Sequence, residues 1–272
     1  MEEILCEILE FLDADMTEPK PYGWFHLLWL ALSFGLGVLF CRLFSKGTEQ
    51  QVRGVVLGVA LVVTALEIYK QINYSCSYEG GQLVWDYQWY IFPWQFCSTP
   101  LYVGLLAGIT KGKLHRSLCA YLGTFALFAG LCVMFYPTTV FVETIGINIQ
   151  TMVCHGTMIS VAMYLLYTGY VKAEGKTVLR ALPIFVAAVT LAVIMNEIAY
   201  RTGLLETETF NMFFVSPYCE PSLVVYSAVQ KAVAFPWCLI LYVGGFTLVA
   251  YIMVLLAKLL LKFKKQKMAI AA

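Results

Sequence analysis

The chain has 272 residues, of which 60% are hydrophobic and only 13% are charged. Soluble globular domains carry about 25% charged residues, so this composition excludes a soluble protein and indicates an integral membrane protein. The formal net charge is +1 and the basic residues form no cluster typical of nucleic-acid binding, so we expect no nucleic-acid partner.

Apolar stretches of about 17 to 25 residues, the length needed to cross a bilayer, occur seven times. We therefore predict an all-α fold, a polytopic membrane bundle of seven transmembrane helices that forms one integral membrane domain over residues 1–272. The predicted spans are 24–44, 54–73, 89–109, 117–136, 148–170, 180–200 and 235–261.

Basic residues are unevenly distributed between the two sides of these spans. The connections after spans one, three and five, and the tail after span seven, contain Arg42, Lys46, Arg53, Lys111, Lys113, Arg116, Lys172, Lys176, Arg180, Lys258, Lys262, Lys264, Lys265 and Lys267. Because cytoplasmic loops retain positive charge, we predict an N-terminus outside, a C-terminus in the cytoplasm and a location in the cell membrane.

Polar side chains occur at one level in several predicted spans. They are His26 in the first span, Glu67 and Lys70 in the second, Gln95, Cys97 and Ser98 in the third, His155 in the fifth, and Asn196 and Glu197 in the sixth. With a rise of about 1.5 Å per residue, these groups fall in roughly the outer third of a ~30 Å hydrocarbon core. Intramembrane ionisable groups usually face the bundle interior, so we expect a polar pocket that opens toward the outer side.

The third span contains the segment FPWQFCSTP, in which Pro93 and Pro100 remove backbone donors and disfavour a regular helix. Irregular backbone at membrane depth is tolerated only against protein or a wet cavity, so this segment is expected to line the pocket. Ser98, Thr99 or water are expected to satisfy the carbonyls of Trp89 and Phe96.

Cys97 and His155 are the candidate chemical groups of this pocket. Amide and hydroxyl neighbours distinguish Cys97 from cysteines that only fill space, and a base at matching depth is what a thiol nucleophile requires. The alternatives are a pocket cysteine without chemistry and a hydrogen-bonded core histidine. The chain has three histidines, His115 is expected in a loop, and no close-spaced ligand pair occurs, so we expect neither a metal nor a cofactor.

The remaining polar residues have two interpretations each. Glu67 and Lys70 either form an ion pair within one helix or serve the site, by orienting His155 or binding a zwitterionic lipid headgroup. Asn196 and Glu197 either form interhelical hydrogen bonds or belong to the site. Outside the membrane, Cys76 and Cys219 are candidates for a disulfide.

Several short motifs in the same order resemble those of the YwaF-like integral membrane proteins, bacterial relatives of the eukaryotic transmembrane protein 164. They are ALEIYK in span two, PWQFC in span three, HG in span five, and NMFFVSP followed by FPW before the last span. In that family the third-span motif resembles Pro-x-His-x-Cys, which falls here on Pro93, Gln95 and Cys97, so Gln95 replaces the usual histidine. The resemblance also assigns family positions to His26, His155 and Asn211, and it implies acyl transfer to lyso-ether-phospholipids through the cysteine and the histidine.

The leading hypothesis is a phospholipid acyltransferase in which Cys97 is the nucleophile and His155 the general base. Glu67 or Glu197 is expected to orient the imidazole, and backbone donors around Ser98 and Thr99 to stabilise the oxyanion. The alternative is a non-enzymatic transporter or binding protein whose pocket, with His26, Glu67, Lys70 and Glu197, holds a small polar solute or a lipid headgroup. Membrane phospholipids are the expected substrate or ligand.

Overall fold

The structure, a computed structural model, describes residues 2–79, 82–137, 140–203, 210–219 and 223–271. Its helices are α1 (Glu2–Leu12), α2 (Trp24–Leu43), α3 (Glu49–Ser75), α4 (Thr99–Ile109), α5 (Gly112–Leu122), α6 (Phe125–Phe135), α7 (Ile145–Tyr167), α8 (Gly175–Arg201), α9 (Val224–Ala232) and α10 (Trp237–Ala271). Single 3₁₀ turns cover Trp89–Ile91 (η1) and Met212–Phe214 (η2), and β1 (Cys76–Glu79) pairs antiparallel with β2 (Gln82–Trp85). The all-α prediction is confirmed except for this two-stranded hairpin, which was not expected.

Among the described residues, six helical stretches are long and apolar enough to cross a membrane. They are α2, α3, the successive helices α5 and α6, α7, α8 and residues Trp237–Lys262 of α10. The multi-pass helical character is therefore confirmed. A seventh spanning helix is not: in the predicted span 89–109, residues 92–98 are irregular, and the 11 residues of α4 rise only about 16 Å, less than a ~30 Å core.

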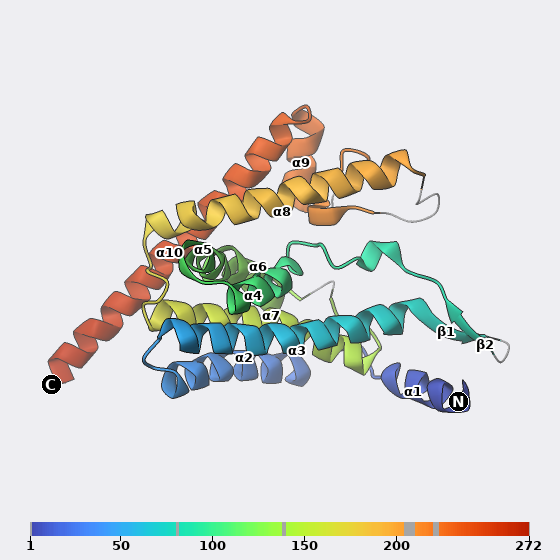
Figure 1. The fold of residues 1–272 in the computed structure, drawn as a ribbon, viewed down its shortest axis with the longest axis horizontal. Helices are drawn as coiled ribbons and strands as arrows, with labels where there is room; N and C mark the ends of the chain where they lie inside the picture. Colours follow the sequence, from blue (N-terminus) through green and yellow to red (C-terminus); the bar gives the residue numbers. More distant parts are fainter. Residues whose placement is uncertain (1, 80–81, 138–139, 204–209, 220–222, 272) are drawn as a thin grey trace.

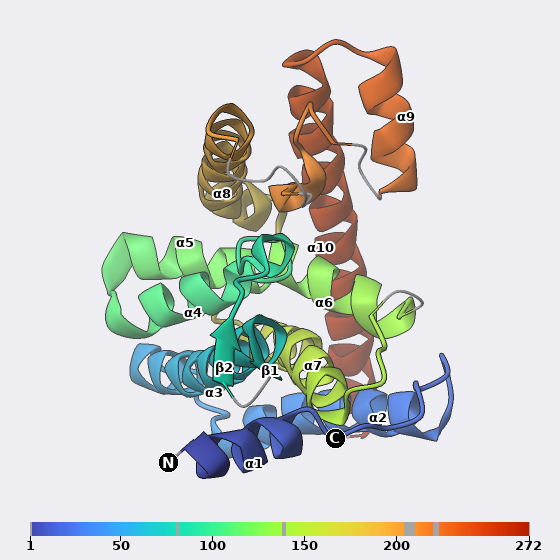
Figure 2. The ribbon, with the colours of Figure 1, turned by 90° about the vertical axis from the view of Figure 1, so that its right-hand side faces the viewer.

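The helices form three layers (Figures 1 and 2). Helices α2, α3 and α7 make one layer, α8 lies on the opposite side, and α4, α5 and α6 lie between them. The middle helices run across the direction of α3 and α8, which are seen side-on in Figure 1 and end-on in Figure 2.

Small residues allow these layers to approach closely, as is common in membrane helix packing. A Cβ on Gly156 of α7 would collide with the Ser33 side chain of α2, and a Cβ on Gly108 of α4 would lie 2.6 Å from Leu57 Cβ of α3. The Ser160 hydroxyl adds a 2.6 Å hydrogen bond to the Ser33 carbonyl. These contacts hold α7 against α2, and α4 of the middle layer against α3.

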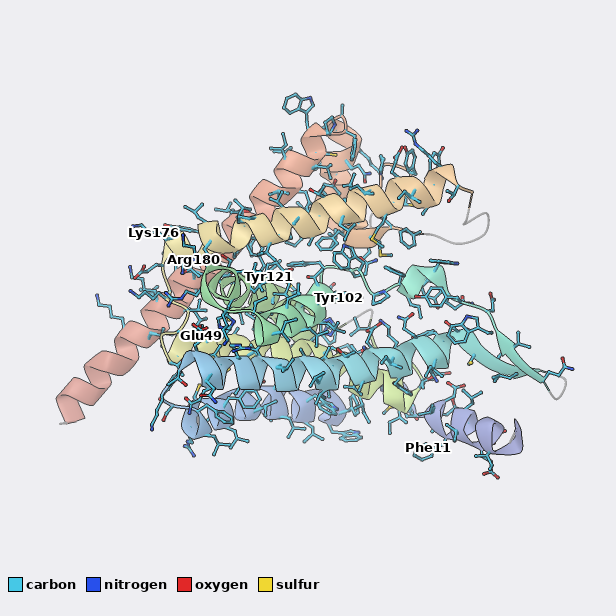
Figure 3. All side chains as sticks on the ribbon, viewed as in Figure 1. Phe11, Glu49, Tyr102, Tyr121, Lys176 and Arg180 are labelled. Carbon is cyan, nitrogen blue, oxygen red and sulfur yellow. The ribbon has the colours of Figure 1, made fainter. Side chains whose placement is uncertain are left out.

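Labelled residues identify the two ends of the molecule. Lys176 and Arg180 lie at the same end as Glu49, whereas Phe11 lies at the opposite end (Figure 3). The C-terminus lies at the Lys176 end and the N-terminus at the Phe11 end, beside the β hairpin (Figure 1).

Candidate functional site

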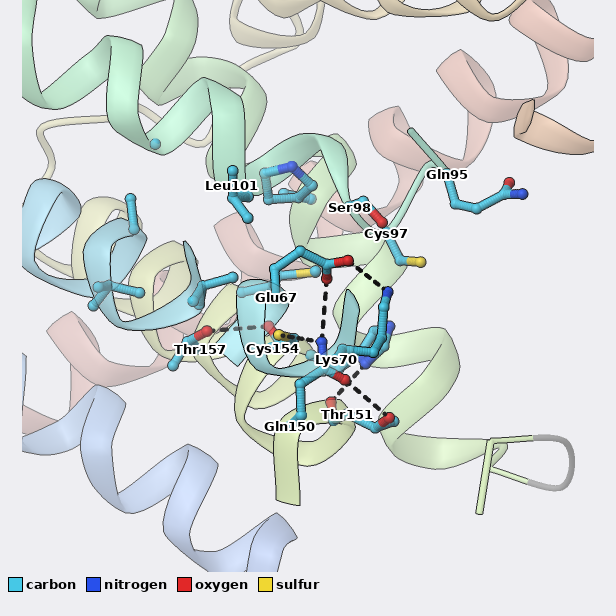
Figure 4. A pocket seen from close by; sticks show the side chains of 18 of the residues that line it. Glu67, Lys70, Gln95, Cys97, Ser98, Leu101, Gln150, Thr151, Cys154 and Thr157 are labelled. Carbon is cyan, nitrogen blue, oxygen red and sulfur yellow. Dashed lines mark hydrogen bonds and ion pairs between the residues drawn. The ribbon is translucent and has the colours of Figure 1, made fainter. Parts of the chain in front are cut away.

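A cavity of about 410 Å³ lies between α3, α4 and α7, next to the irregular segment that precedes α4. Ligand sites in proteins have volumes of roughly 300–1,000 Å³, so its size fits a small molecule or part of a lipid. Its polar lining, most of which Figure 4 labels, consists of Glu67, Lys70, Tyr74, Gln95, Cys97, Ser98, Gln150, Thr151, Cys154, His155 and Thr157. The structure thus brings together six side chains of the predicted site, namely Glu67, Lys70, Gln95, Cys97, Ser98 and His155, and places His26, Asn196, Glu197 and Asn211 elsewhere.

Glu67 is the centre of a hydrogen-bonded network on the cavity wall. Its Oε1 lies 2.8 Å from Lys70 Nζ and accepts a 2.7 Å hydrogen bond from Gln71, and its Oε2 accepts a 3.3 Å bond from Gln150. Its side chain is 10% exposed, so these donors replace the water that a carboxylate requires. Glu67 and Lys70 therefore form the predicted ion pair within one helix.

Tyr87 extends this network toward the hairpin end. Its hydroxyl donates a 2.7 Å hydrogen bond to Gln71 Oε1. Burial and the nearby Glu67 carboxylate raise the pKa of the Tyr87 phenol, which keeps the phenol protonated and able to donate.

His155 has an unusual pattern of hydrogen bonds for a buried histidine. Its Nδ1 lies 2.7 Å from the Thr151 carbonyl oxygen, and its buried Nε2 has no hydrogen-bond partner among the described residues. Because a carbonyl only accepts, Nδ1 must carry the proton, and in the neutral ring Nε2 is then left with a lone pair. Thr151, rather than the expected Glu67 or Glu197, orients the imidazole, and the group left for chemistry is Nε2.

Cys97 lies in the predicted break before α4. Pro100 occupies the first turn of α4, where its missing N–H costs nothing, and the backbone from residue 92 to 98 is non-helical or turned. Thr99 donates a 2.9 Å hydrogen bond to the Phe96 carbonyl, as predicted. The N–H groups of Ser98 and Thr99 both donate to the Gln95 carbonyl, at 2.9 and 3.2 Å, so these predicted oxyanion donors are already occupied.

Phe96 anchors the backbone on the other side of Cys97. Its ring packs against Phe185 of α8 and Phe246 of α10, with centroid separations of 5.5 and 5.0 Å. Aromatic pairs of this geometry contribute about 1 kcal/mol each beyond their burial. Cys97 therefore sits between a packed aromatic residue and the first turn of α4, which restricts where its thiol can lie.

Gln95 has a structural role beside the thiol. Its amide donates to the Asn211 carbonyl and accepts from the Phe213 N–H, both at 3.0 Å. Asn196 of α8 donates to the Met212 carbonyl at 3.0 Å and accepts from the Met212 N–H at 2.7 Å. The Asn211 side chain accepts from a backbone N–H of its own loop, that of Ser216, at 2.9 Å.

The loop held by these amides is strained. Phe213 and Phe214 have φ values of 58° and 56°, a left-handed conformation that is rare for aromatic residues. The Tyr242 hydroxyl adds a 2.9 Å hydrogen bond to the Phe213 carbonyl. Such backbone persists only where surrounding contacts over-determine it, so Gln95, Asn196 and Tyr242 act together to hold this loop against the Cys97 segment.

His26 and Glu197 lie outside the cavity. His26 is fully buried at the start of α2, where Nδ1 accepts from the Tyr22 N–H and Nε2 donates to the Met134 carbonyl, both at 2.8 Å. Glu197, at the end of α8, pairs with Arg201 and accepts a 2.7 Å hydrogen bond from Tyr218, whose pKa is raised by that bond. Both residues connect elements of the fold.

Gln150, Thr151 and Cys154 are cavity residues that the sequence interpretation did not assign to the site. Gln150 donates to both Glu67 and Cys154, at 3.3 and 3.4 Å, and so joins α3 to α7. An amide in an otherwise apolar span is the same signal that singled out Gln95, and it identifies Gln150 equally well. The role of Thr151 has no sequence signal, because it rests on a backbone carbonyl.

Other sulfur and nitrogen groups do not extend the site. No group of three His, Cys, Asp or Glu side chains suited to a metal occurs in the described part of the chain. Cys76 and Cys219 are both free thiols, so the suggested disulfide is absent. His115 is fully buried in α5, 2.8 Å from the Ala107 carbonyl, which corrects its expected position in a loop.

Comparison with known proteins gives one match. Neither the curated proteins nor the solved structures include one that matches the chain. The model of the TMEM164 family matches residues 21–256, which contain every cavity residue and the strained loop. The chain therefore belongs to the TMEM164 family.

Proposed function

We propose that this protein is a membrane-embedded acyltransferase that acts on phospholipids and lysophospholipids through Cys97 and His155. The proposal rests chiefly on His155 Nε2. The lone pair of this buried nitrogen has no hydrogen-bond partner in the described part of the chain, and His155 lines the cavity that Cys97 also lines. A thiol and an imidazole base are the components of cysteine acyl transfer. No hydrogen bond joins His155 Nε2 to Cys97, and catalytic contacts often tighten only when substrate binds.

In the first step, the Cys97 thiol attacks the carbonyl carbon of a phospholipid ester and His155 Nε2 takes the thiol proton. The tetrahedral intermediate collapses as the ester C–O bond breaks, and the leaving lysolipid oxygen takes the proton back from the imidazolium. The product is an acyl thioester on Cys97, and the ring returns to the tautomer that Thr151 selects.

In the second step, the hydroxyl of an acceptor lysophospholipid attacks the thioester. His155 Nε2 removes the hydroxyl proton and returns it to the departing Cys97 sulfur. Lys70 is the cation among the cavity residues and is proposed to stabilise the oxyanion in both steps, since the Ser98 and Thr99 N–H groups are already bonded.

The test is acyl transfer by the purified protein in vesicles of defined diacyl phospholipid with an isotopically labelled lysophospholipid. Label is expected in diacyl lipid for the wild type and for Cys132→Ala, an exposed cysteine outside the cavity. It is expected to be lost in Cys97→Ala and His155→Ala. Equal label in all four proteins would reject the proposal.

The Glu67 network favours a second candidate function, a transporter or binding protein without chemistry. The paired ammonium and carboxylate of Lys70 and Glu67 match the two charges of a zwitterionic headgroup or small solute. In that case Cys97 is protected from thiol reagents by the solute and never carries an acyl group, which mass spectrometry of the intact protein distinguishes.

We further propose that the chain makes seven crossings of the cell membrane, with the N-terminus outside and the C-terminus in the cytoplasm. Two features support this arrangement. The termini lie at opposite ends of the molecule (Figure 1), as an odd number of crossings requires. The basic residues Lys176 and Arg180 lie at the C-terminal end (Figure 3), as expected for the cytoplasmic side.

A further inference from the structure

The cavity continues beyond its polar residues as an apolar channel. Past Glu67 and His155 its lining is apolar apart from Thr157, whose hydroxyl donates a 3.0 Å hydrogen bond to the Cys154 carbonyl. The apolar lining residues there are Val56, Val59, Ala60, Val63, Leu101, Gly104, Leu122, Ala126, Met158 and Val161. None of these side chains has a role in the chemistry proposed above, so the channel needs a separate explanation.

The register of α3 against α7 gives the length of the channel. The hydrogen bond between Gln150 and Glu67 aligns the two antiparallel helices. Val161 lies 11 residues past Gln150 and Val56 lies 11 residues before Glu67, so both are about 16 Å from this level along their helices. Val56 and Val161 therefore mark the same far end of the channel.

The channel is closed at that end. One turn further, Val52 of α3 and Leu165 of α7 are fully buried and do not line the cavity. On the α4 side, a Cβ on Gly104 would lie 3.0 Å from Ala60 Cβ and 3.8 Å from Val56 Cγ1, so α4 packs directly on α3 there. The channel has a floor rather than an exit.

The cavity is also elongated. It is lined along α3 from Tyr74 to Val56, about 27 Å at the helical rise. A cavity of this length accommodates an extended chain, whereas a compact polar solute would fill only part of it.

We infer that this channel holds the fatty acyl chain of the group attached to Cys97, and that Val56 and Val161 set the longest chain that fits. The inference rests on the proposed acyl transfer for its substrate class. Beyond Glu67 and His155 the cavity lining is apolar apart from Thr157, so a chain whose carbonyl is at Cys97 meets mainly apolar side chains there. Methylenes gain from such burial, whereas a polar solute does not.

The experiment measures the fit of a chain without requiring acyl transfer. The full-length protein in vesicles reacts with N-ethyl, N-butyl, N-octyl, N-dodecyl and N-hexadecyl maleimide, in which the thiol adds across the ring double bond. Mass spectrometry gives the labelling of Cys97 relative to that of Cys132. Because Cys132 is exposed on α6, this ratio cancels the partition of each reagent into the lipid.

The expected ratio is constant for short chains and falls about tenfold once the chain exceeds the channel, since overfilling a packed interior is costly. Val56→Phe should move the fall to shorter chains and Val56→Ala to longer ones. Val62, on the lipid-exposed face of the same helix at 54% exposure, provides the matched controls Val62→Phe and Val62→Ala, which should match the wild type.

Several results would overturn the inference. They are a ratio independent of chain length, Val56 variants that shift it no more than Val62 variants, or no Cys97 labelling even by the N-ethyl reagent. Protection of Cys97 by cholesteryl hemisuccinate but not by palmitate would assign the channel to a ring system instead. A clear cut-off without acyl transfer in the lysophospholipid assay would uphold the channel and reject only the proposed function.

Discussion

At the residue scale, the chemistry depends on which nitrogen of His155 is free. The Thr151 carbonyl holds the proton on Nδ1, so Nε2 is the base. His155→Gln retains a donor for Thr151 and removes that base. We expect it to slow N-ethylmaleimide labelling of Cys97 about a hundredfold, the usual contribution of a general base. The rate at Cys132 in the same molecule is the internal control, and an unchanged Cys97 rate would show that His155 does not serve the thiol.

A second residue-scale prediction concerns the ion pair on the cavity wall. Glu67→Gln leaves the Lys70 ammonium, whose side chain is only 18% exposed, without its carboxylate. Breaking a buried pair in this way costs about 3 kcal/mol, whereas removing both charges together costs much less. Glu67→Gln should therefore lower the thermal unfolding midpoint, and the Glu67→Gln/Lys70→Met double variant should recover most of the loss. If the losses in the unfolding midpoint for Glu67→Gln and for Lys70→Met alone add up to the loss for the double variant, the two charges are not coupled.

At the element scale, sequence patterns predicted the helices well and the loops poorly. Apolar stretches located α2, α3, α7, α8 and α10, because lipid requires long apolar helices. Pro93 and Pro100 located the break at Cys97, since the cost of proline in a helix is local. The clamp that Gln95, Asn196 and Tyr242 form on the loop at 210–216 was not predictable. Two of its hydrogen bonds join Gln95 to Asn211 and Phe213, which lie 116 and 118 positions further along the chain. A periodic sequence pattern reports only contacts between near neighbours, so it does not predict these.

The clamp gives an element-scale prediction. Gln95→Leu leaves the Asn211 carbonyl and the Phe213 N–H without partners, and unsatisfied groups of this kind cost about 2 kcal/mol. The strained loop should then relax and release the backbone next to Cys97, so both the unfolding midpoint and the Cys97 labelling rate should change. Gln82→Leu, an exposed glutamine in β2, is the matched control and should leave both unchanged. Wild-type values for Gln95→Leu would mean that Asn196 and Tyr242 hold the loop alone.

At the scale of the whole molecule, hydropathy located six of the seven predicted spans as long helical stretches but did not give their directions. Helices α4, α5 and α6 run across α3 and α8 (Figures 1 and 2). The transfer free energy of an apolar stretch depends on its composition and length, so it carries no information about this angle. The polar groups Glu67 and Lys70 of α3 and His155 of α7 line one cavity, whereas His26 and Glu197, which the helical rise predicted at the same depth, lie outside it.

The number of crossings follows from a labelling experiment that separates the two arrangements. If α4 crosses the membrane with the segment before it, Gln82 is outside and Lys176 is cytoplasmic. If that segment turns back, α5 and α6 begin outside and Lys176 is outside too.

The experiment introduces Gln82→Cys and Lys176→Cys separately into a parent whose cysteines at 6, 76 and 219 are replaced by serine. Reaction with a membrane-impermeant maleimide then shows on which side of the membrane each new cysteine lies. Because the basic end of the bundle should face the cytoplasm, we expect Gln82→Cys to react in intact cells and Lys176→Cys only after permeabilisation. Reaction of both in intact cells would reduce the crossings to six and place the C-terminus outside, against the opposite placement of the two termini in Figure 1.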